Sequence, residues 1–255
     1  MQNVPVTSLY ECPEYYDILF GWDRDAEAHA YDTALIDHGA PRGGRVLEVA
    51  AGTAQIGVRL AQIGWSVTAL DVSDPMLAYA TARAQSAGVR LATMTADMRF
   101  FARTDTFRAA INPMSSFRLL LEDADIGDHL NCIADALMPG GVYLIDIAFG
   151  TEGTAESDLD EWSMQRDDIT VTATAQEVRV EDAPRRIHLK LDWHEALRSY
   201  TPESFAAVVA RCERLRLTGC YPEVRICDDD ISRFTSTVDD KLPSAGRALV
   251  ALSRL

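Results

Sequence analysis

The stretch Val46-Leu47-Glu48-Val49-Ala50-Ala51-Gly52-Thr53-Ala54 decides the fold, because it joins an apolar strand to a turn of small residues. The strand spans 45–49, and a helix is expected over 54–63. Small residues let the backbone approach a ligand closely, and the first turn of a following helix offers unpaired N–H groups. The sequence therefore predicts a strand–turn–helix unit that opens an α/β sheet.

Strand-like and helix-like segments continue to alternate along the chain. Asp74 is a candidate N-cap with Pro75 behind it, and Gly88 is a candidate helix stop. A later helix shows apolar residues at helical spacing and is expected to end at 139–141: Ile126, Leu130, Ile133 and Leu137. Further strands are expected at 66–70, 89–95, 107–111 and 142–147. Repeated units of this kind predict a doubly wound, mostly parallel seven-stranded sheet with helices on both faces.

The pattern changes after residue 149. Segments 169–180 and 186–194 alternate polar and apolar residues, which predicts an antiparallel hairpin. Thr201 and Pro202 begin another helix, and 215–221 and 247–252 supply the last strands. We expect one domain over 1–255, with an aromatic-rich helical lid at 1–40 and an inserted cap at 150–200.

The composition of the chain argues against several classes of function. The net charge of −15 argues against nucleic acid, because phosphate binding needs clustered Lys and Arg. The five cysteines are widely spaced, which argues against a metal site or a disulfide framework. The N-terminus lacks a signal-peptide pattern, and no apolar run is long enough to span a membrane. These features predict a cytoplasmic protein that binds neither metal, membrane nor nucleic acid.

Acidic residues follow two further strands. Asp71 closes the second strand, where a carboxylate can accept both hydroxyls of a ribose. Asp97 and Met98 follow the third strand, where a carboxylate and a backbone N–H can bind an adenine edge. Because the carboxyl ends of parallel strands share one edge of a sheet, the three turns are expected to meet there.

These motifs resemble the class I S-adenosylmethionine-dependent methyltransferases over roughly residues 10–255. The resemblance rests on VLEVAAGTA, LDVSDPML, TADMRFF and the run ending LMPGGVYLIDI. YYDILF near the N-terminus, the Ser115-Ser116 pair and the long cap are most similar to aminosugar N,N-dimethyltransferases. The resemblance implies a Rossmann-like fold, S-adenosyl-L-methionine as cofactor, S-adenosyl-L-homocysteine as product, and a small-molecule acceptor.

The resemblance also assigns roles to residues. Glu48 and Gly52 would lie against the methionine portion, Asp71 would hold the ribose and Met76 would pack on adenine. The full implied cofactor set is Tyr16, Glu48, Ala50, Gly52, Asp71, Val72, Met76, Asp97, Met98 and Asn112. Alanine replaces glycine at two of the three usual positions, Ala50 and Ala54.

Methyl transfer from a sulfonium is a direct displacement, so catalysis rests largely on positioning and on exclusion of water. Candidate catalytic residues are Tyr16, which would close over the methionine end, and His194 in the cap. His29, His38 and His129 are expected on polar surfaces. Candidate acceptor-binding residues are Tyr15, Phe20, Trp22, Arg24, Ser115, Ser116, Arg118 and Trp193. The resemblance and the lack of a clear base favour a nitrogen acceptor over oxygen.

Other interpretations remain open at this point. Asn112-Pro113 matches the start of a motif found in protein or nucleic-acid N-methyltransferases, but its second proline is missing. A nicotinamide-dependent oxidoreductase would need GxGxxG, which is absent. A protein that binds the cofactor for a non-methylating reaction stays an alternative, as does a peptide N-methyltransferase. The cap is also a candidate homodimer contact.

Overall fold

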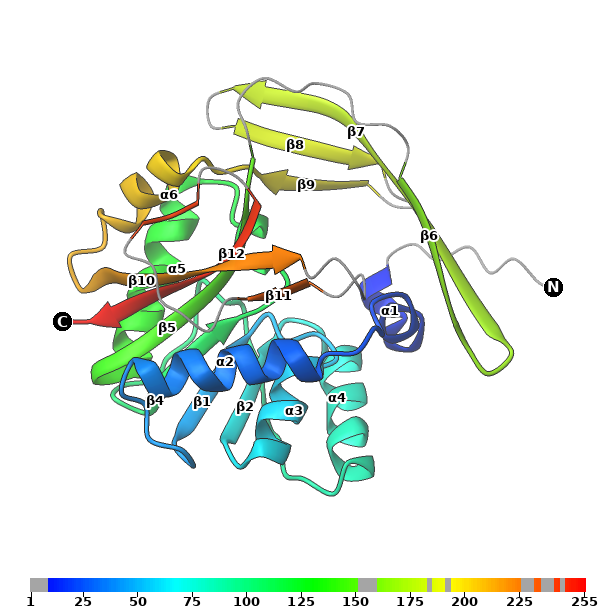
Figure 1. Cartoon of the computed structure of the whole chain (residues 1–255), viewed down its shortest axis with the longest axis horizontal. Helices are drawn as coiled ribbons and strands as arrows, with labels where there is room; N and C mark the ends of the chain where they lie inside the picture. Colours follow the sequence, from blue (N-terminus) through cyan, green and yellow to red (C-terminus); the bar gives the residue numbers. More distant parts are fainter. Residues whose placement is uncertain are drawn as a thin grey trace.

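A computed structural model describes residues 9–150, 160–182, 185–190, 194–225, 232–234, 241–243 and 246–255. Two sheets organise this part of the chain. The larger has eight strands in the order β11-β10-β12-β5-β4-β1-β2-β3, and the smaller has four in the order β6-β7-β8-β9 (Figure 1). The larger sheet carries the expected doubly wound α/β arrangement.

The first half of the large sheet follows the sequence pattern closely. β1 (Arg45–Val49) leads into α3 (Gln55–Ile63), and β2 (Ser66–Asp71) leads into α4 (Asp74–Ser86) and β3 (Ala92–Thr95). β1 pairs in parallel with both β2 and β4. The N-cap of α4 is Ser73 rather than the expected Asp74, because the Ser73 hydroxyl accepts a hydrogen bond from Met76 N at 3.3 Å.

The second half departs from expectation at one junction. β4 (Phe107–Asn112) is followed by the short helix η2 (Ser116–Leu119), α5 (Asp123–Ala136) and β5 (Leu137–Phe149). The Pro-Gly-Gly segment was expected to separate helix from strand. Instead α5 ends before it and β5 runs through it, with Gly140 at φ +72. Glycine adopts this left-handed conformation without steric cost.

Antiparallel strands complete the sheet. β12 (Gly246–Arg254) pairs with β5, and β10 (Leu215–Arg225) pairs with β12. These and the five parallel strands make up the expected seven. The eighth is the three-residue β11 (Ser232–Phe234) at the β10 edge, too short to leave a period-two signal in the sequence.

Helices cover both faces of the large sheet. On one face, α2 (Asp25–Asp37) and α3 pack against strand residues such as Ile111 and Leu144. On the other, α5 and α6 (Pro202–Val209) pack against residues such as Leu47 and Ile145. Each strand of the centre is therefore buried on both sides, which explains its continuous apolar sequence.

The lid and the cap contact each other, because α1 lies against β6 and β7. The lid begins with η1 (Leu9–Glu11) and α1 (Pro13–Leu19). The described part of the cap consists of β6 (Asp160–Arg166), β7 (Ile169–Asp182), β8 (Arg185–Lys190) and β9 (His194–Arg198). The expected hairpin is its central pair, and β6 passes beside α1 (Figure 1).

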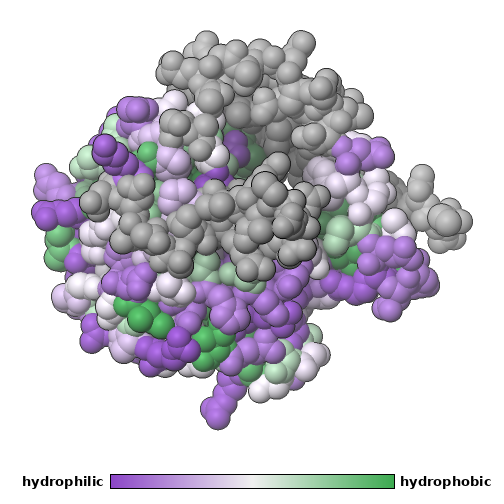
Figure 2. Space-filling model, in the orientation of Figure 1, coloured by the Kyte–Doolittle hydropathy of each residue, from purple (hydrophilic) through white to green (hydrophobic). Residues whose placement is uncertain are grey.

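On the face of the molecule seen in Figure 2, the described surface is largely polar. Figure 2 shows mostly hydrophilic residues on the visible described face, with hydrophobic ones in small separate areas. Such a surface agrees with the net charge of −15. None of the helices in the described ranges has the length and apolar character needed to cross a bilayer.

Candidate functional site

Four neighbouring strands end at one cavity of about 780 Å³. The turn after β1, the residue that closes β2, the segment after β3 and the loop after β4 all line it, with α1 and β6 opposite. Of the residues expected from the sequence, these line the cavity: Tyr16, Phe20, Ala50, Gly52, Asp71, Val72, Asp97, Met98, Ser115, Ser116 and Arg118. The topology thus brings together residues more than 100 positions apart in the sequence.

The turn after β1 adopts left-handed backbone at alternate residues. Ala50, Gly52 and Ala54 have φ of 51, 52 and 51°. Alanine takes this conformation at a steric cost of about 1–2 kcal/mol. Ala54 is fully buried among α3 and α4 residues, so its methyl group points away from the cavity. Replacement of the usual glycine there leaves the cavity open.

Glu48 lies beneath this turn, where burial perturbs its carboxyl group. It is 1% exposed, and its Oε1 accepts a hydrogen bond from Gly57 N at 3.2 Å. Burial, with a smaller effect of the Asp71 charge, raises the pKa of Glu48 to about 8, although the Gly57 N–H opposes this. Glu48 is therefore protonated at neutral pH. It does not line the cavity and acts as a support for the turn.

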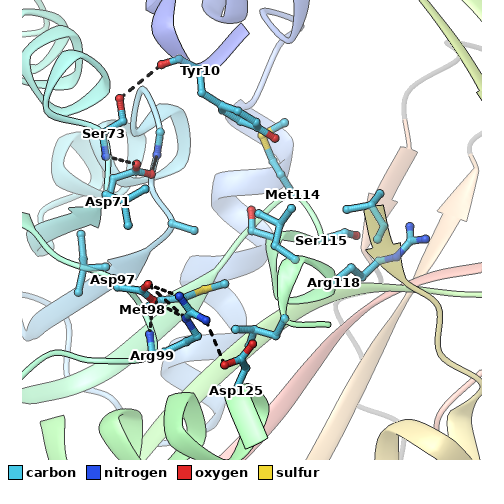
Figure 3. A pocket seen from close by; sticks show the side chains of 18 of the residues that line it. Tyr10, Asp71, Ser73, Asp97, Met98, Arg99, Met114, Ser115, Arg118 and Asp125 are labelled. Atoms are coloured by element: carbon cyan, nitrogen blue, oxygen red, sulfur yellow. Dashed lines mark hydrogen bonds and ion pairs between the residues drawn. The ribbon is translucent and has the colours of Figure 1, made fainter. Parts of the chain in front are cut away.

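Asp71 is oriented toward the cavity by two backbone groups (Figure 3). Its Oδ2 accepts a hydrogen bond from Gly52 N at 2.8 Å and its Oδ1 accepts one from Ser73 N at 2.9 Å. A carboxylate has about four acceptor positions, so one remains on each oxygen. Asp71 can thus accept two adjacent hydroxyl groups without moving.

The segment after β3 contains an ion pair that the sequence analysis missed. Asp97 Oδ1 accepts a hydrogen bond from Arg99 Nε at 3.0 Å, and Asp97 Oδ2 accepts one from Arg99 Nη2 at 2.7 Å. Arg99 also contacts Asp125 Oδ1 through Nη1 at 3.0 Å, and all three residues line the cavity (Figure 3). The Arg99 hydrogen bonds lower the pKa of Asp97. The Asp-x-Arg spacing was the available signal.

His129 corrects an expectation. It was expected on the polar face of α5, but it is fully buried. Its Nδ1 lies 2.9 Å from Met98 O and its Nε2 lies 2.8 Å from the Tyr143 hydroxyl. Burial lowers the pKa of His129 to about 4, so the ring is neutral at pH 7. Because a carbonyl oxygen only accepts, Nδ1 carries the proton, and the ring fixes the segment that carries Asp97.

The lid covers the turn with aromatic rings. A Cβ placed on Gly52 would lie 3.7 Å from Tyr16 Cε1, so the Tyr16 ring lies directly over this glycine. Phe20 packs on Tyr16, with ring centroids 4.8 Å apart, and Trp162 of β6 lies 6.3 Å from Phe20. These rings cover the cavity from the side opposite the strand ends and can exclude water.

Three lid residues expected to line an acceptor site lie elsewhere. Arg24 is buried, because its Nη1 pairs with Glu27 at 2.6 Å and its Nε donates to Gln55 Oε1. Trp22 lies against the Arg24 guanidinium at 4.0 Å and is largely exposed. Tyr15 packs in the cluster between α1 and β7. The lid sequence alone did not indicate which side of α1 and its following loop faces the cavity.

The loop after β4 has strained backbone at the cavity wall. Met114 and Ser115 have φ of 56 and 55°, which is uncommon for residues other than glycine. The Met114 sulfur lies 3.8 Å from the Tyr16 hydroxyl. Arg118 Nε donates to Arg198 O at 2.9 Å. In Figure 3, Asp71 and Asp97 lie on one side of the cavity and Ser115 and Arg118 on the other.

Two further expected residues whose side chains are described, Asn112 and Met76, do not line the cavity surface. Asn112 is buried and donates to Val49 O at 3.2 Å, and Met76 is buried within α4. Trp193 lies outside the described residues, and His194 lies in β9, where only the backbone is described. Their assigned roles stay predictions. Within the described ranges, no cluster of three or more His, Cys, Asp or Glu side chains is suited to hold a metal ion.

Comparison with known proteins finds similarity over the part of the chain that contains β1 to β4. A family model described as a methyltransferase domain matches residues 46–141. YqeM of Bacillus subtilis is 33% identical over 124 residues, which cover 47% of this chain and 50% of YqeM. The match therefore spans about half the length of that relative. The Streptomyces venezuelae dTDP-3-amino-3,4,6-trideoxy-alpha-D-glucopyranose N,N-dimethyltransferase is 28% identical over 174 residues, covering 68% of this chain and 72% of that protein.

Solved structures share the whole architecture. Streptomyces venezuelae DesVI superposes with a TM-score of 0.70 at 20% identity, over 98% of this chain and all of that chain. The SAM-bound amino pentose methyltransferase CalS10 of Micromonospora echinaspora gives 0.67 at 20% identity, over the full length of both chains. At this identity the likeness concerns the fold.

Proposed function

We propose that this chain, as a member of the class I S-adenosylmethionine-dependent methyltransferases, transfers a methyl group to a nitrogen of a small-molecule acceptor. The observation that carries the proposal is the convergence of Gly52, Asp71 and Asp97 on one cavity. Three turns with those chemistries match the three parts of an adenosyl sulfonium: amino acid, ribose and base. The absence of GxGxxG disfavours a nicotinamide cofactor, and the net charge of −15 disfavours a site for nucleic acid.

The residues present fit S-adenosylmethionine. Asp71 has an acceptor position on each oxygen for a ribose hydroxyl, and two backbone N–H groups hold it in place. Gly52 leaves room for close approach of the methionine portion under the Tyr16 ring. The Asp97–Met98 segment offers a carboxylate for an adenine amino group, and Arg99 neutralises its charge.

When bound, this cofactor supplies an electrophilic methyl group on a positively charged sulfur. The chain itself contributes the positioning of the reacting groups and the exclusion of water from the cavity. Tyr16, Phe20 and Trp162 cover the cavity, while Met114 and Ser115 form the wall where an acceptor would enter. An in-line approach along this wall would place the acceptor nitrogen opposite the leaving sulfur.

An amine acceptor suits the described cavity lining. No histidine is among the described lining residues, and an amine that arrives uncharged needs no general base. The acceptor is proposed to be an amino group on a sugar, as the names of the Streptomyces relatives state for those proteins.

We further propose that the chain acts in secondary metabolism and in the cytoplasm. The four cysteines in the described part are all free thiols, which agrees with a reducing compartment. Homodimer formation through the cap remains a prediction.

Two measurements test the proposal. Titration calorimetry of the full chain with S-adenosylhomocysteine is expected to give saturable binding at one site. Methyl-labelled cofactor is then supplied with nucleotide-linked aminosugars, their hydroxyl analogues and free glycine, and products are identified by mass spectrometry. N-methylation of the aminosugar supports the proposal, whereas exclusive O-methylation or transfer to glycine contradicts the proposed acceptor. Absence of S-adenosylhomocysteine binding would contradict the activity itself.

A further inference from the structure

Asp17 lies on the buried side of α1, directly after Tyr16, and is 2% exposed. Its Oδ1 accepts hydrogen bonds from Thr53 Oγ1 at 3.1 Å and from Gln55 Nε2 at 2.9 Å. Thr53 and Gln55 stand just beyond Gly52 in the turn after β1. Asp17 therefore holds this turn from behind, while Tyr16 covers it from the cavity side.

The same carboxylate also binds the cap and α4. Its Oδ2 accepts a hydrogen bond from Arg166 Nη1 at 2.9 Å and one from the Tyr79 hydroxyl at 3.2 Å. Arg166 Nη2 donates to the Asp17 backbone carbonyl at 3.1 Å, so the two residues are joined at two points. Arg83 of α4 forms a further ion pair with Asp17. Arg166 is the last residue of β6, at the start of the cap hairpin turn.

We propose that Asp17 is a positioning residue that, through Arg166, couples the placement of the cap to the geometry of the turn that holds the cofactor. This inference rests on the proposed function. α1 transmits the coupling, because Asp17 and Tyr16 are neighbours on it and Phe20 packs toward Trp162 of β6. A cap held by Arg166 keeps the Tyr16 ring over Gly52 and the cavity closed to water.

Alternative purposes for this cluster are weaker. A buried ion pair often contributes little net stability, because desolvation of both charges offsets their attraction. Stability alone thus gives no reason for one carboxylate to join the lid, the turn, α4 and the cap. A role in holding the turn and the cap in register accounts for the contacts of Asp17 with Thr53, Gln55 and Arg166.

Arg166→Gln is the sharpest test. Arg166 is 42% exposed on its side chain, and Asp17 keeps Arg83 as a counter-ion, so the fold should be retained. Arg214→Gln is the matched control: Arg214 is 41% exposed and forms an ion pair with Asp135 at 2.7 Å, away from the cavity. Arg214→Gln leaves Asp135 in solvent, where loss of an ion pair costs little. Arg166→Gln leaves the buried Asp17 carboxylate, but that carboxylate keeps the Arg83 guanidinium as its partner.

We expect Arg166→Gln to raise the dissociation constant of S-adenosylhomocysteine roughly fivefold to tenfold, in line with loss of a charge-assisted hydrogen bond. The thermal midpoint should match that of Arg214→Gln, whose affinity should equal that of the wild type. Asp17→Asn should also weaken S-adenosylhomocysteine binding. The variant that carries both Asp17→Asn and Arg166→Gln should bind no more weakly than the weaker binder of the two single variants, because the two residues act together.

The outcomes separate this inference from the proposed function. Equal affinity of wild type and Arg166→Gln overturns the coupling while leaving the proposed function standing. A lower thermal midpoint with unchanged affinity overturns it as well, because it reveals a purely structural ion pair. If the wild type does not bind S-adenosylhomocysteine at all, the proposed function falls and the coupling falls with it.

Discussion

Asp71 is held in its orientation toward the cavity by hydrogen bonds from the Gly52 and Ser73 N–H groups. We predict that Asp71→Ala weakens S-adenosylhomocysteine binding at least roughly tenfold, because hydrogen bonds to a charged acceptor contribute about 1.5–3 kcal/mol. Titration calorimetry measures this. Asp135→Ala, which removes an exposed carboxylate paired with Arg214, is the control and should bind as the wild type does. Unchanged affinity of Asp71→Ala would reject the ribose assignment.

Glu48 makes stability depend on pH in a direction that can be derived. Its pKa is about 8 in the folded chain against 4.5 when exposed, so between these values the folded state holds the additional proton. The free energy of unfolding therefore falls as pH rises from about 4.5 to about 8, by up to about 1.4 kcal/mol per pH unit. Glu48→Gln should remove this pH dependence. Its free energy of unfolding should therefore fall less than that of the wild type when the pH is raised from 6 to 8.5.

Urea unfolding of both proteins at these two pH values measures the difference, which we expect to be on the order of 2 kcal/mol. Parallel pH dependence of the wild type and Glu48→Gln would mean that Glu48 is ionised in the folded chain.

Gly57 is required by the Glu48 carboxyl group. A Cβ on Gly57 would lie 2.1 Å from Glu48 Oε2, a distance that forces a shift of buried atoms. We predict that Gly57→Ala destabilises the fold by about 1–3 kcal/mol, the usual cost of overpacking. Gly127→Ala is the control, because a Cβ there meets nothing within 4 Å and alanine favours the helix by about 1 kcal/mol. Chemical denaturation should therefore give opposite signs, and a stabilising Gly57→Ala would be inconsistent with this packing.

At this scale the sequence predicted the residues that end strands, and for a physical reason. Strand ends are set by local pattern, so Asp71 and Asp97 could be placed at one sheet edge. Arg99 and Asp125 could not be paired, because they meet only through the packing of α5. His129 was assigned to the wrong face, although it stands three residues after Ile126 on the apolar stripe.

Among the elements, α5 holds the segment after β3 in place. His129 accepts a hydrogen bond from the Tyr143 hydroxyl and donates one to Met98 O. We predict that Tyr143→Phe destabilises the fold by about 1–3 kcal/mol, because it leaves a buried His129 nitrogen unsatisfied. Tyr200→Phe is the control: the Tyr200 hydroxyl is buried and has no hydrogen-bond partner among the described residues, so its removal should be neutral or stabilising. Urea denaturation compares the two, and equal losses would contradict the assigned hydrogen bond.

Element prediction succeeded where burial imposes a period and failed where it does not. The central strands are buried on both faces, and their apolar runs gave correct positions. β6 carries the polar sequence Asp-Glu-Trp-Ser-Met-Gln-Arg, so the cap was expected as a hairpin rather than as four strands. The cap strands pair in the order in which they follow one another along the chain, each antiparallel to the next, and β6 also contacts α1.

For the whole molecule, the lid, the sheet and the cap enclose one cavity, and this has a thermodynamic consequence. α1 packs on the cap through Leu19 and Ala173, and Asp17 forms hydrogen bonds with Gln55 at the start of α3 and with Arg166 of β6. We therefore predict that the chain unfolds in one calorimetric transition that includes the cap, as expected for a single domain. A ligand that binds only the folded chain at 100 times its dissociation constant adds about 2.7 kcal/mol.

For a chain of this size that gain corresponds to a rise of roughly 5–10 °C in the melting temperature. Differential scanning calorimetry with and without S-adenosylhomocysteine measures both the number of transitions and the shift. An early transition that the ligand leaves in place would mean that the cap melts independently of the site, and it would contradict the single-domain prediction. A single transition that moves as a whole would instead establish that the strand ends, the lid and the cap share one binding equilibrium.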